Sequence, residues 1–145
     1  AINHRRLVFP FLRKFILWSL LIICLSFAAL YFILPWLTGW LLGTGWEETG
    51  ELIRVLLPWL AVSTVSASLG FVSDVFGKQK MSAIIEFTYT ALRAMAIGLG
   101  IWLHDFRLAV MAYALVGWLV QSFLLGWYLV LAKNYDNRIL AKEFD

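Results

Sequence analysis

Four long hydrophobic stretches, separated by short polar segments, dominate the pattern along the chain. They cover residues 15–42, 50–76, 81–103 and 108–131. A helix needs about 20 apolar residues to cross roughly 30 Å of hydrocarbon, where it must satisfy its own backbone groups. Each stretch meets this length. The pattern therefore predicts an all-α integral membrane fold with four transmembrane helices.

The remaining segments divide the chain around this membrane region. We expect a cytoplasmic basic flank at residues 1–14, a four-helix membrane region at 15–132 and a cytoplasmic tail at 133–145. The tail has mixed charge and is expected to form a short extension or a frayed helix. Pro35 and Pro58 fall inside predicted spans, where proline removes a backbone donor and favours a bend.

Composition excludes a water-soluble fold. Hydrophobic residues make up 62% of the chain and charged residues 14%, against about 45–50% and about 25% in ordinary soluble domains. The first stretch is too long for the apolar part of a signal peptide. Cys24 is the single cysteine, so the chain can form neither an internal disulfide nor a cysteine-based metal site.

Lysine and arginine are distributed unevenly between the two ends of the spans. Nine of them flank the first stretch, the second connector and the tail: Arg5, Arg6, Arg13, Lys14, Lys78, Lys80, Lys133, Arg138 and Lys142. The opposite connectors contain Arg107, with Glu47, Glu48 and Asp105. The positive-inside rule therefore predicts that both termini are cytoplasmic. These residues form no continuous basic stripe, which argues against a nucleic-acid partner.

Tryptophans support the same orientation. Trp36, Trp40, Trp46 and Trp102 fall near the predicted outer ends of the spans. Indole rings are favoured at the interface between membrane and water. Topology and aromatic placement therefore agree.

Polar residues in the third stretch are the strongest candidates for a site. Glu86, Tyr89 and Arg93 occur at positions i, i+3 and i+7 and share one helical face. A charge at the bilayer centre costs about 2.5–3.5 kcal/mol, so Arg93 is expected to face protein or a wet cavity. One interpretation pairs Arg93 with an acid on another helix to fix packing, and the other places it in an anionic-substrate cavity. Glu86 lies close enough to the cytoplasmic end to reach the headgroups.

No catalytic or cofactor motif is present in the sequence. The segment GTGWEETG lacks the spacing of a nucleotide-binding loop. His4 and His104 are predicted on opposite sides of the membrane, so they cannot share a metal. Ser63 and Ser66 have no histidine at their predicted depth, and we interpret them as packing residues. We therefore expect no enzyme activity, no metal and no cofactor.

The segment GTGWEETGELIRVLLPWL, at residues 43–60, resembles the polysaccharide-biosynthesis flippases of the multidrug/oligosaccharidyl-lipid/polysaccharide superfamily. The similar features are Trp46 with the acids after it, Gly50, Arg54, and then Leu56, Pro58 and Trp59 entering a hydrophobic stretch. The later GKQK turn and the hairpin after it also resemble the carboxy-terminal half of such proteins. Family members have about twelve or more helices in two lobes. The resemblance, together with a first residue that is not methionine, implies the last part of a larger helical transporter bundle.

The resemblance implies translocation of undecaprenyl-diphosphate-linked oligosaccharide across the bacterial inner membrane, for polysaccharide or O-antigen biosynthesis. The partners would be the remaining transporter helices, the lipid-linked oligosaccharide and membrane lipids. Arg93, Glu86, Tyr89 and Arg54 are the candidates for the substrate cavity, and Arg54 is nearer the predicted outer surface. The alternatives are a drug/cation antiporter with Glu86 as its proton-coupled carboxylate, and a membrane scaffold that transports nothing.

Overall fold

Helices account for almost all of the part of the chain that the structure describes. The computed structural model describes residues 7–43 and 45–141. In chain order the helices are α1 (Val8–Leu42), α2 (Glu47–Ser68), α3 (Val72–Val75), α4 (Gln79–Trp102) and α5 (Phe106–Ala141). Four helical segments, one of them made of α2 and α3 together, are long and apolar enough to cross a membrane. The all-α class and the four candidate spans predicted from hydrophobicity are thus confirmed.

Two helices extend beyond their predicted spans. α1 begins at Val8, upstream of residue 15, and α5 continues to Ala141 through most of the predicted tail. At about 1.5 Å per residue, the 36 residues of α5 form a rod about 54 Å long. The tail is therefore regular helix as far as residue 141, while residues 142–145 lie outside the described part.

The second predicted span is interrupted near the end that the sequence predicts to be cytoplasmic. A turn at residues 69–71 separates α2 from α3. Ser68 donates its hydroxyl to the carbonyl of Val65 at 2.7 Å, and the N–H of Leu69 bonds the carbonyl of Ser66 at 3.0 Å. Such local bonds compete with the regular helical pattern, and Gly70 favours helix weakly. Hydrophobicity alone does not predict this break, because residues on both sides of it are apolar.

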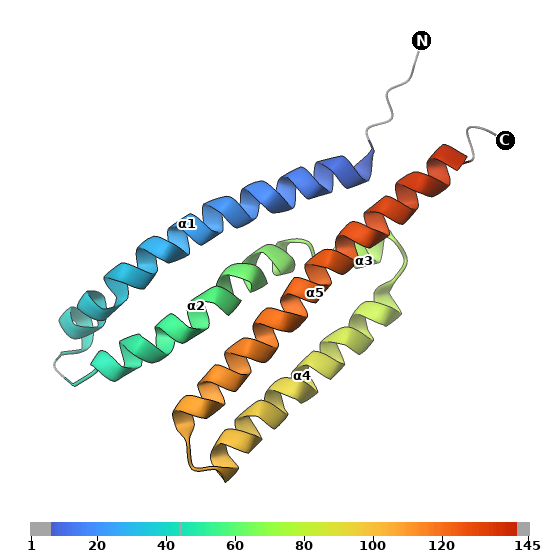
Figure 1. Cartoon of the computed structure of the whole chain (residues 1–145). Helices are drawn as coiled ribbons and strands as arrows, with labels where there is room; N and C mark the ends of the chain where they lie inside the picture. The colour runs from blue at the N-terminus through green and yellow to red at the C-terminus, as the bar shows by residue number, and fades with distance from the viewer. Residues whose placement is uncertain (1–6, 44, 142–145) are drawn as a thin grey trace.

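The helices lie side by side in the order α1, α2, α5, α4 (Figure 1). α1 also contacts α5, and the two approach each other at the end where α1 begins and α5 finishes. The main core lies there and joins α1, α2, α3 and α5; its buried members are Leu12, Ile16, Val65, Leu69, Val72, Leu124, Leu125, Tyr128 and Ala132. α4 stands at one edge of this layer and packs mainly on α5.

Small residues allow the closest helix contacts. A Cβ added to Gly100 of α4 would overlap the Cβ of Ala109 on α5 and lie 2.7 Å from its Cα. A Cβ added to Gly50 of α2 would lie 2.7 Å from the hydroxyl oxygen of Thr38 on α1. Because small side chains let two backbones approach inside a membrane, these positions set the spacing of both helical hairpins.

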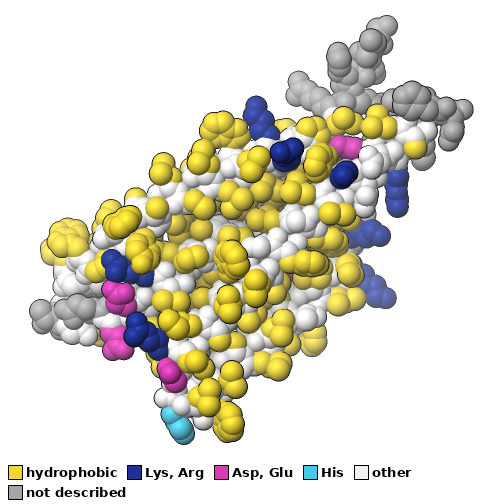
Figure 2. Space-filling model, in the orientation of Figure 1, with side chains coloured by type: hydrophobic (Ala, Val, Ile, Leu, Met, Phe, Trp, Pro, Cys, Tyr) yellow, Lys and Arg dark blue, Asp and Glu magenta, His cyan; other side chains and the backbone are white. Residues whose placement is uncertain are grey.

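The surface is hydrophobic over the middle of the molecule and charged towards its ends. Figure 2 shows lysine, arginine and acidic side chains gathered at the two ends of the visible face, with hydrophobic side chains between them. The four predicted interface tryptophans, Trp36, Trp40, Trp46 and Trp102, are all exposed. This distribution is compatible with a multi-pass membrane protein. The orientation of the termini remains a prediction.

Candidate functional site

Arg93 lies deep within α4 and is surrounded by aromatic rings from three helices. It is 14 residues after Gln79 and 9 before Trp102, so it lies about 21 Å along the helix axis from the start of α4. The guanidinium carbon is 3.8 Å from the ring centroid of Tyr113, 4.7 Å from that of Trp59 and 4.9 Å from that of Tyr89. These four residues form what we call the aromatic cage. It joins α2, α4 and α5.

The rings of the cage hold one another in place. The indole N–H of Trp59 donates a hydrogen bond to the hydroxyl of Tyr89 at 3.1 Å. The ring of Trp59 also meets the ring of Tyr113 edge to face, with centroids 5.3 Å apart and an interplanar angle of 84°. Gly117 gives Trp59 its space, because a Cβ at that position would overlap the indole. The position of the guanidinium is therefore set by α2 and α5 as well as by its own helix.

The cage stabilises the cation without neutralising it. An arginine over an aromatic face gains about 0.5–2 kcal/mol, the larger value applying when the site is dry. Among the described residues, the ion pair present is that of Arg54 with Glu51, so no carboxylate is paired with Arg93. The Nε atom of Arg93 is buried and has no hydrogen-bond partner. The site thus combines a cation that no described acid balances with a buried donor that has no partner, which makes Arg93 a candidate for binding an anionic group.

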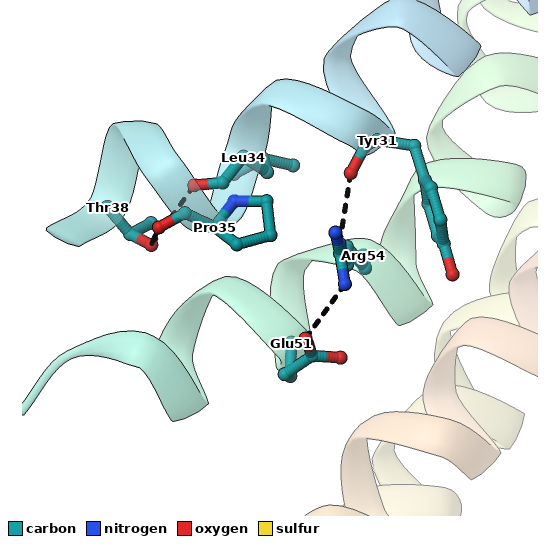
Figure 3. A network of polar contacts seen from close by, with 6 residues as sticks. All are labelled: Tyr31, Leu34, Pro35, Thr38, Glu51 and Arg54. Carbon is teal, nitrogen blue, oxygen red and sulfur yellow. Dashed lines mark hydrogen bonds and ion pairs between the residues drawn. The ribbon is translucent and has the colours of Figure 1, made fainter.

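Arg54 has a different environment, at the contact between α1 and α2 (Figure 3). Its Nε–H donates to the carbonyl of Tyr31 at 2.9 Å, and its Nη1 lies 2.8 Å from a carboxylate oxygen of Glu51. The guanidinium also stacks 4.7 Å from the ring centroid of Tyr31. The carbonyl of Tyr31 would ordinarily receive the N–H of residue 35, and Pro35 has none. Arg54 therefore supplies the hydrogen bond that Pro35 removes.

The polar network continues along α1 beyond the proline. The hydroxyl of Thr38 donates to the carbonyls of Leu34 and Pro35, at 3.0 and 3.1 Å (Figure 3). Thr38 is buried where Gly50 approaches it from α2. Within this network the charge of Arg54 is balanced by Glu51, and its Nε and Nη1 each donate a hydrogen bond. Arg54 is accordingly a residue that joins two helices, and the structure does not bring it to the aromatic cage.

Of the two remaining predicted site residues, the structure brings Tyr89 to Arg93 and leaves Glu86 apart. Tyr89 is buried and belongs to the cage, so the i to i+4 relation of Tyr89 and Arg93 does bring these two together. Glu86 is exposed on α4, and its backbone carbonyl accepts a hydrogen bond from the hydroxyl of Thr90 at 2.9 Å. Glu86 therefore shares the helix of Arg93 but takes no part in the cage.

A cavity of about 600 Å³ adjoins the cage on the side of the connection between α4 and α5. Its walls are mostly apolar, with His104 and Asp105 contributed by the connection itself. Tyr113 lines the cavity and also stacks on Arg93. The ring of Tyr113 therefore stands between this apolar space and Arg93, which does not itself line the cavity.

Trp59 and Tyr113 are the cage residues that sequence reasoning missed. Both occur in hydrophobic stretches, where an aromatic side chain ordinarily faces lipid or another helix. A partial signal was present, because a mid-span arginine requires compensation and aromatic faces can supply it as well as acids. The sequence spacing does not reveal which rings those are, since they come from two other helices.

No group of three or more His, Cys, Asp or Glu side chains that could hold a metal ion occurs in residues 7–43 and 45–141. His4, which we predicted on the opposite side of the membrane from His104, lies outside the described residues. The expected absence of catalysis and of a cofactor remains a prediction. No protein-family model, curated protein or solved structure matches the chain.

Proposed function

We propose that this chain is part of a flippase that moves an undecaprenyl-diphosphate-linked oligosaccharide across the bacterial inner membrane for polysaccharide or O-antigen biosynthesis. In this proposal the four helices form one portion of a larger bundle. The other helices of the full-length transporter complete the path. Arg93 interacts with the diphosphate, and the aromatic cage holds Arg93 in position.

The observation that carries the proposal is the unneutralised cation of the aromatic cage. Arg93 lies far inside an apolar helix with three rings around it and, among the described residues, no carboxylate paired with it. A diphosphate and its glycan are too polar to cross hydrocarbon unaided, so a transporter must present a hydrated, cationic surface near mid-membrane. The apolar cavity beside Tyr113 supports a substrate that also carries a hydrophobic chain.

The resemblance at residues 43–60 provides a second line of support. Within that segment Arg54 and Pro58 lie on α2, followed by Trp59, which enters the aromatic cage. The segment that suggested the family therefore contributes directly to the environment of Arg93. We assign Arg54 and Glu86 no contact with substrate in this proposal.

The test is restoration of surface polysaccharide in a flippase-deficient strain that expresses the full-length protein. We expect Arg93→Leu to lower export at least tenfold at equal membrane abundance. Arg93→Lys should retain part of the activity, because lysine keeps the charge while losing the planar donor array. Arg54→Leu is the matched control, since it removes a guanidinium that is already paired with an acid.

Abundance separates this proposal from a purely structural role of Arg93. If Arg93→Leu lowers only the amount of folded protein, and export per molecule is normal, the cage serves packing and the scaffold interpretation is favoured. If Arg93→Leu and Arg54→Leu lower export per molecule equally, the proposed difference in role between Arg93 and Arg54 is wrong. Normal export by Arg93→Leu at normal abundance overturns the proposal.

A drug/cation antiporter is the second candidate, and the exposure of Glu86 favours it. An ionisable carboxylate on a candidate span is a functional hypothesis in its own right. The antiporter predicts that Glu86→Gln abolishes cation efflux and that Arg93→Leu leaves efflux intact. The complete reading frame gives a further distinction, since about eight upstream spans beside glycosyltransferase genes would favour the flippase.

A further inference from the structure

The first and last helices are joined at the end where α1 begins. Asp136 of α5 accepts hydrogen bonds from the backbone N–H groups of Val8 and Phe9, at 3.0 and 2.8 Å. These residues are 128 and 127 positions apart from it in sequence. The first N–H groups of a helix have no partner within the helix, and a carboxylate at that place also interacts favourably with the helix dipole. Asp136 is buried and forms an N-terminal cap for α1 supplied by α5.

Exposed basic side chains lie on the helices at this same end of the molecule. We call them the basic collar, and they are Arg13, Lys14, Lys78, Lys80, Lys133 and Arg138. They come from α1, from the segment before α4 and the first turn of α4, and from the last part of α5. The described acids near them in sequence are Asp74, Glu86 and Asp136, and the carboxylate of Asp136 is already bonded to the start of α1. The collar therefore keeps a net positive charge.

If the four candidate spans cross a bilayer, the collar falls at the depth of the lipid headgroups. Arg13 and Lys14 directly precede the first apolar stretch, and Lys78 and Lys80 directly precede the third. Beyond residue 131 the rise of the helix places Lys133 roughly 3 Å and Arg138 roughly 10 Å from the end of the fourth stretch. Each headgroup layer is roughly 5–8 Å thick. Most of the collar thus falls within or next to a single headgroup layer.

We propose that the basic collar binds the anionic phospholipid headgroups of the leaflet at this end of the molecule, and that Asp136 holds the α1 and α5 parts of the collar together. The partner is the bilayer surface, because the cations are arranged around helices that meet it and anionic headgroups are concentrated there. The inference concerns a surface remote from the aromatic cage. It does not depend on the proposed transport function.

The test uses the purified full-length protein in detergent with added lipid, and its readout is the melting temperature. We expect phosphatidylglycerol to raise the melting temperature by several degrees more than phosphatidylcholine. The difference should fall by at least half between 50 and 500 mM NaCl, because salt screens exposed charges. The double variants Arg13→Gln/Lys14→Gln and Lys133→Gln/Arg138→Gln should each lose at least half of the difference. Arg107→Gln, at the other end of the molecule, should keep it.

Variants of Asp136 distinguish a positioning role of this residue from a simple effect of its charge on lipid preference. Counting charges alone, Asp136→Ala makes the collar more positive and should strengthen the preference for phosphatidylglycerol. If Asp136 positions the collar, the same change should weaken it, and Asp136→Asn, which keeps one acceptor oxygen, should fall between. If Asp136→Ala does not fold, the comparison of Asp136→Asn with the unchanged protein decides the point.

Three results with added lipid would overturn the inference: equal stabilisation by the two lipids, retention of the difference in both collar double variants, or an increased difference in the Asp136 variants. Inorganic phosphate at matched ionic strength should not reproduce the effect. If it does, the collar binds free anions and not the lipid surface. Failure of this test leaves the aromatic cage and the flippase proposal untouched, because transport is not measured.

Discussion

The two arginines in the apolar part of this protein, Arg54 and Arg93, use the same side chain in opposite ways. Both stack on tyrosine. Arg54 is paired with Glu51 and bonds the carbonyl of Tyr31. Arg93 has three rings, no paired acid among the described residues and a buried Nε without a partner. Arg54 completes a structural contact between two helices. The charge of Arg93 is not balanced by any described acid.

This difference shows that the presence of an arginine in a span does not by itself indicate a substrate site. The surroundings decide, because an acid neutralises the charge whereas an aromatic face stabilises it and leaves it positive. By this criterion Arg93 is a candidate for binding an anion and Arg54 is not. Substitutions at Gly117, Arg54, Pro35 and Tyr89 would test the comparison, and we expect their effects to decrease in that order.

Gly117→Leu should destabilise the protein most, by about 3 kcal/mol, the upper end of the range for overpacking a close contact. The new side chain would occupy the space of the Trp59 indole and displace it from the aromatic cage, while the network of Arg54 is left intact. Thermal or denaturant unfolding in detergent measures the loss. Gly126→Leu is the control, because a Cβ at Gly126 meets no atom within 4 Å. Equal stability of the two variants would show that Trp59 is not fixed by α5.

Arg54→Leu should cost about 2 kcal/mol, since it leaves the carbonyl of Tyr31 without a donor in a candidate span, where detergent or lipid chains supply none. Arg54→Lys should recover part of this loss through its single ammonium group. The measurement is again the free energy of unfolding. A loss below about 0.5 kcal/mol for Arg54→Leu would contradict a structural role.

In the Pro35→Ala background, the loss of unfolding free energy caused by Arg54→Leu should be about 1 kcal/mol smaller than in the unchanged protein. Alanine restores an N–H that can bond the carbonyl of Tyr31, so removing Arg54 from the Pro35→Ala background should cost less than removing it from the unchanged protein. The coupling comes from a double-mutant cycle of Pro35→Ala with Arg54→Leu. An additive cycle would mean that Arg54 does not compensate for the proline.

Tyr89→Phe should have the smallest effect, about 0.5 kcal/mol, the lower end of the range for one hydrogen bond. It removes the hydroxyl that accepts from the indole of Trp59 and keeps the ring that faces Arg93. Tyr31→Phe serves as the control, because its backbone carbonyl still receives Arg54 and its ring is retained. If Tyr89→Phe were no more destabilising than Tyr31→Phe, the hydrogen bond would not hold the cage.

Sequence reasoning identified half of the aromatic cage. Tyr89 and Arg93 lie on one helix, so helical periodicity places them together. Trp59 and Tyr113 lie on α2 and α5, and no local rule relates their positions to Arg93. The role of Arg54 also depends on a contact between helices, although Pro35 signals that the carbonyl of Tyr31 will lack its usual partner.

The sequence by itself determined the all-α class and the four candidate spans, because spanning hydrocarbon requires long apolar helices and this requirement is local to each segment. Helix packing decided the rest. In the tertiary structure Arg93 contacts three aromatic rings and no acid among the described residues. Arg54 donates a hydrogen bond to α1, and Asp136 accepts one from the start of that helix. These pairings join residues distant in sequence, so they depend on which helix faces meet, and in an apolar chain many faces are similarly hydrophobic.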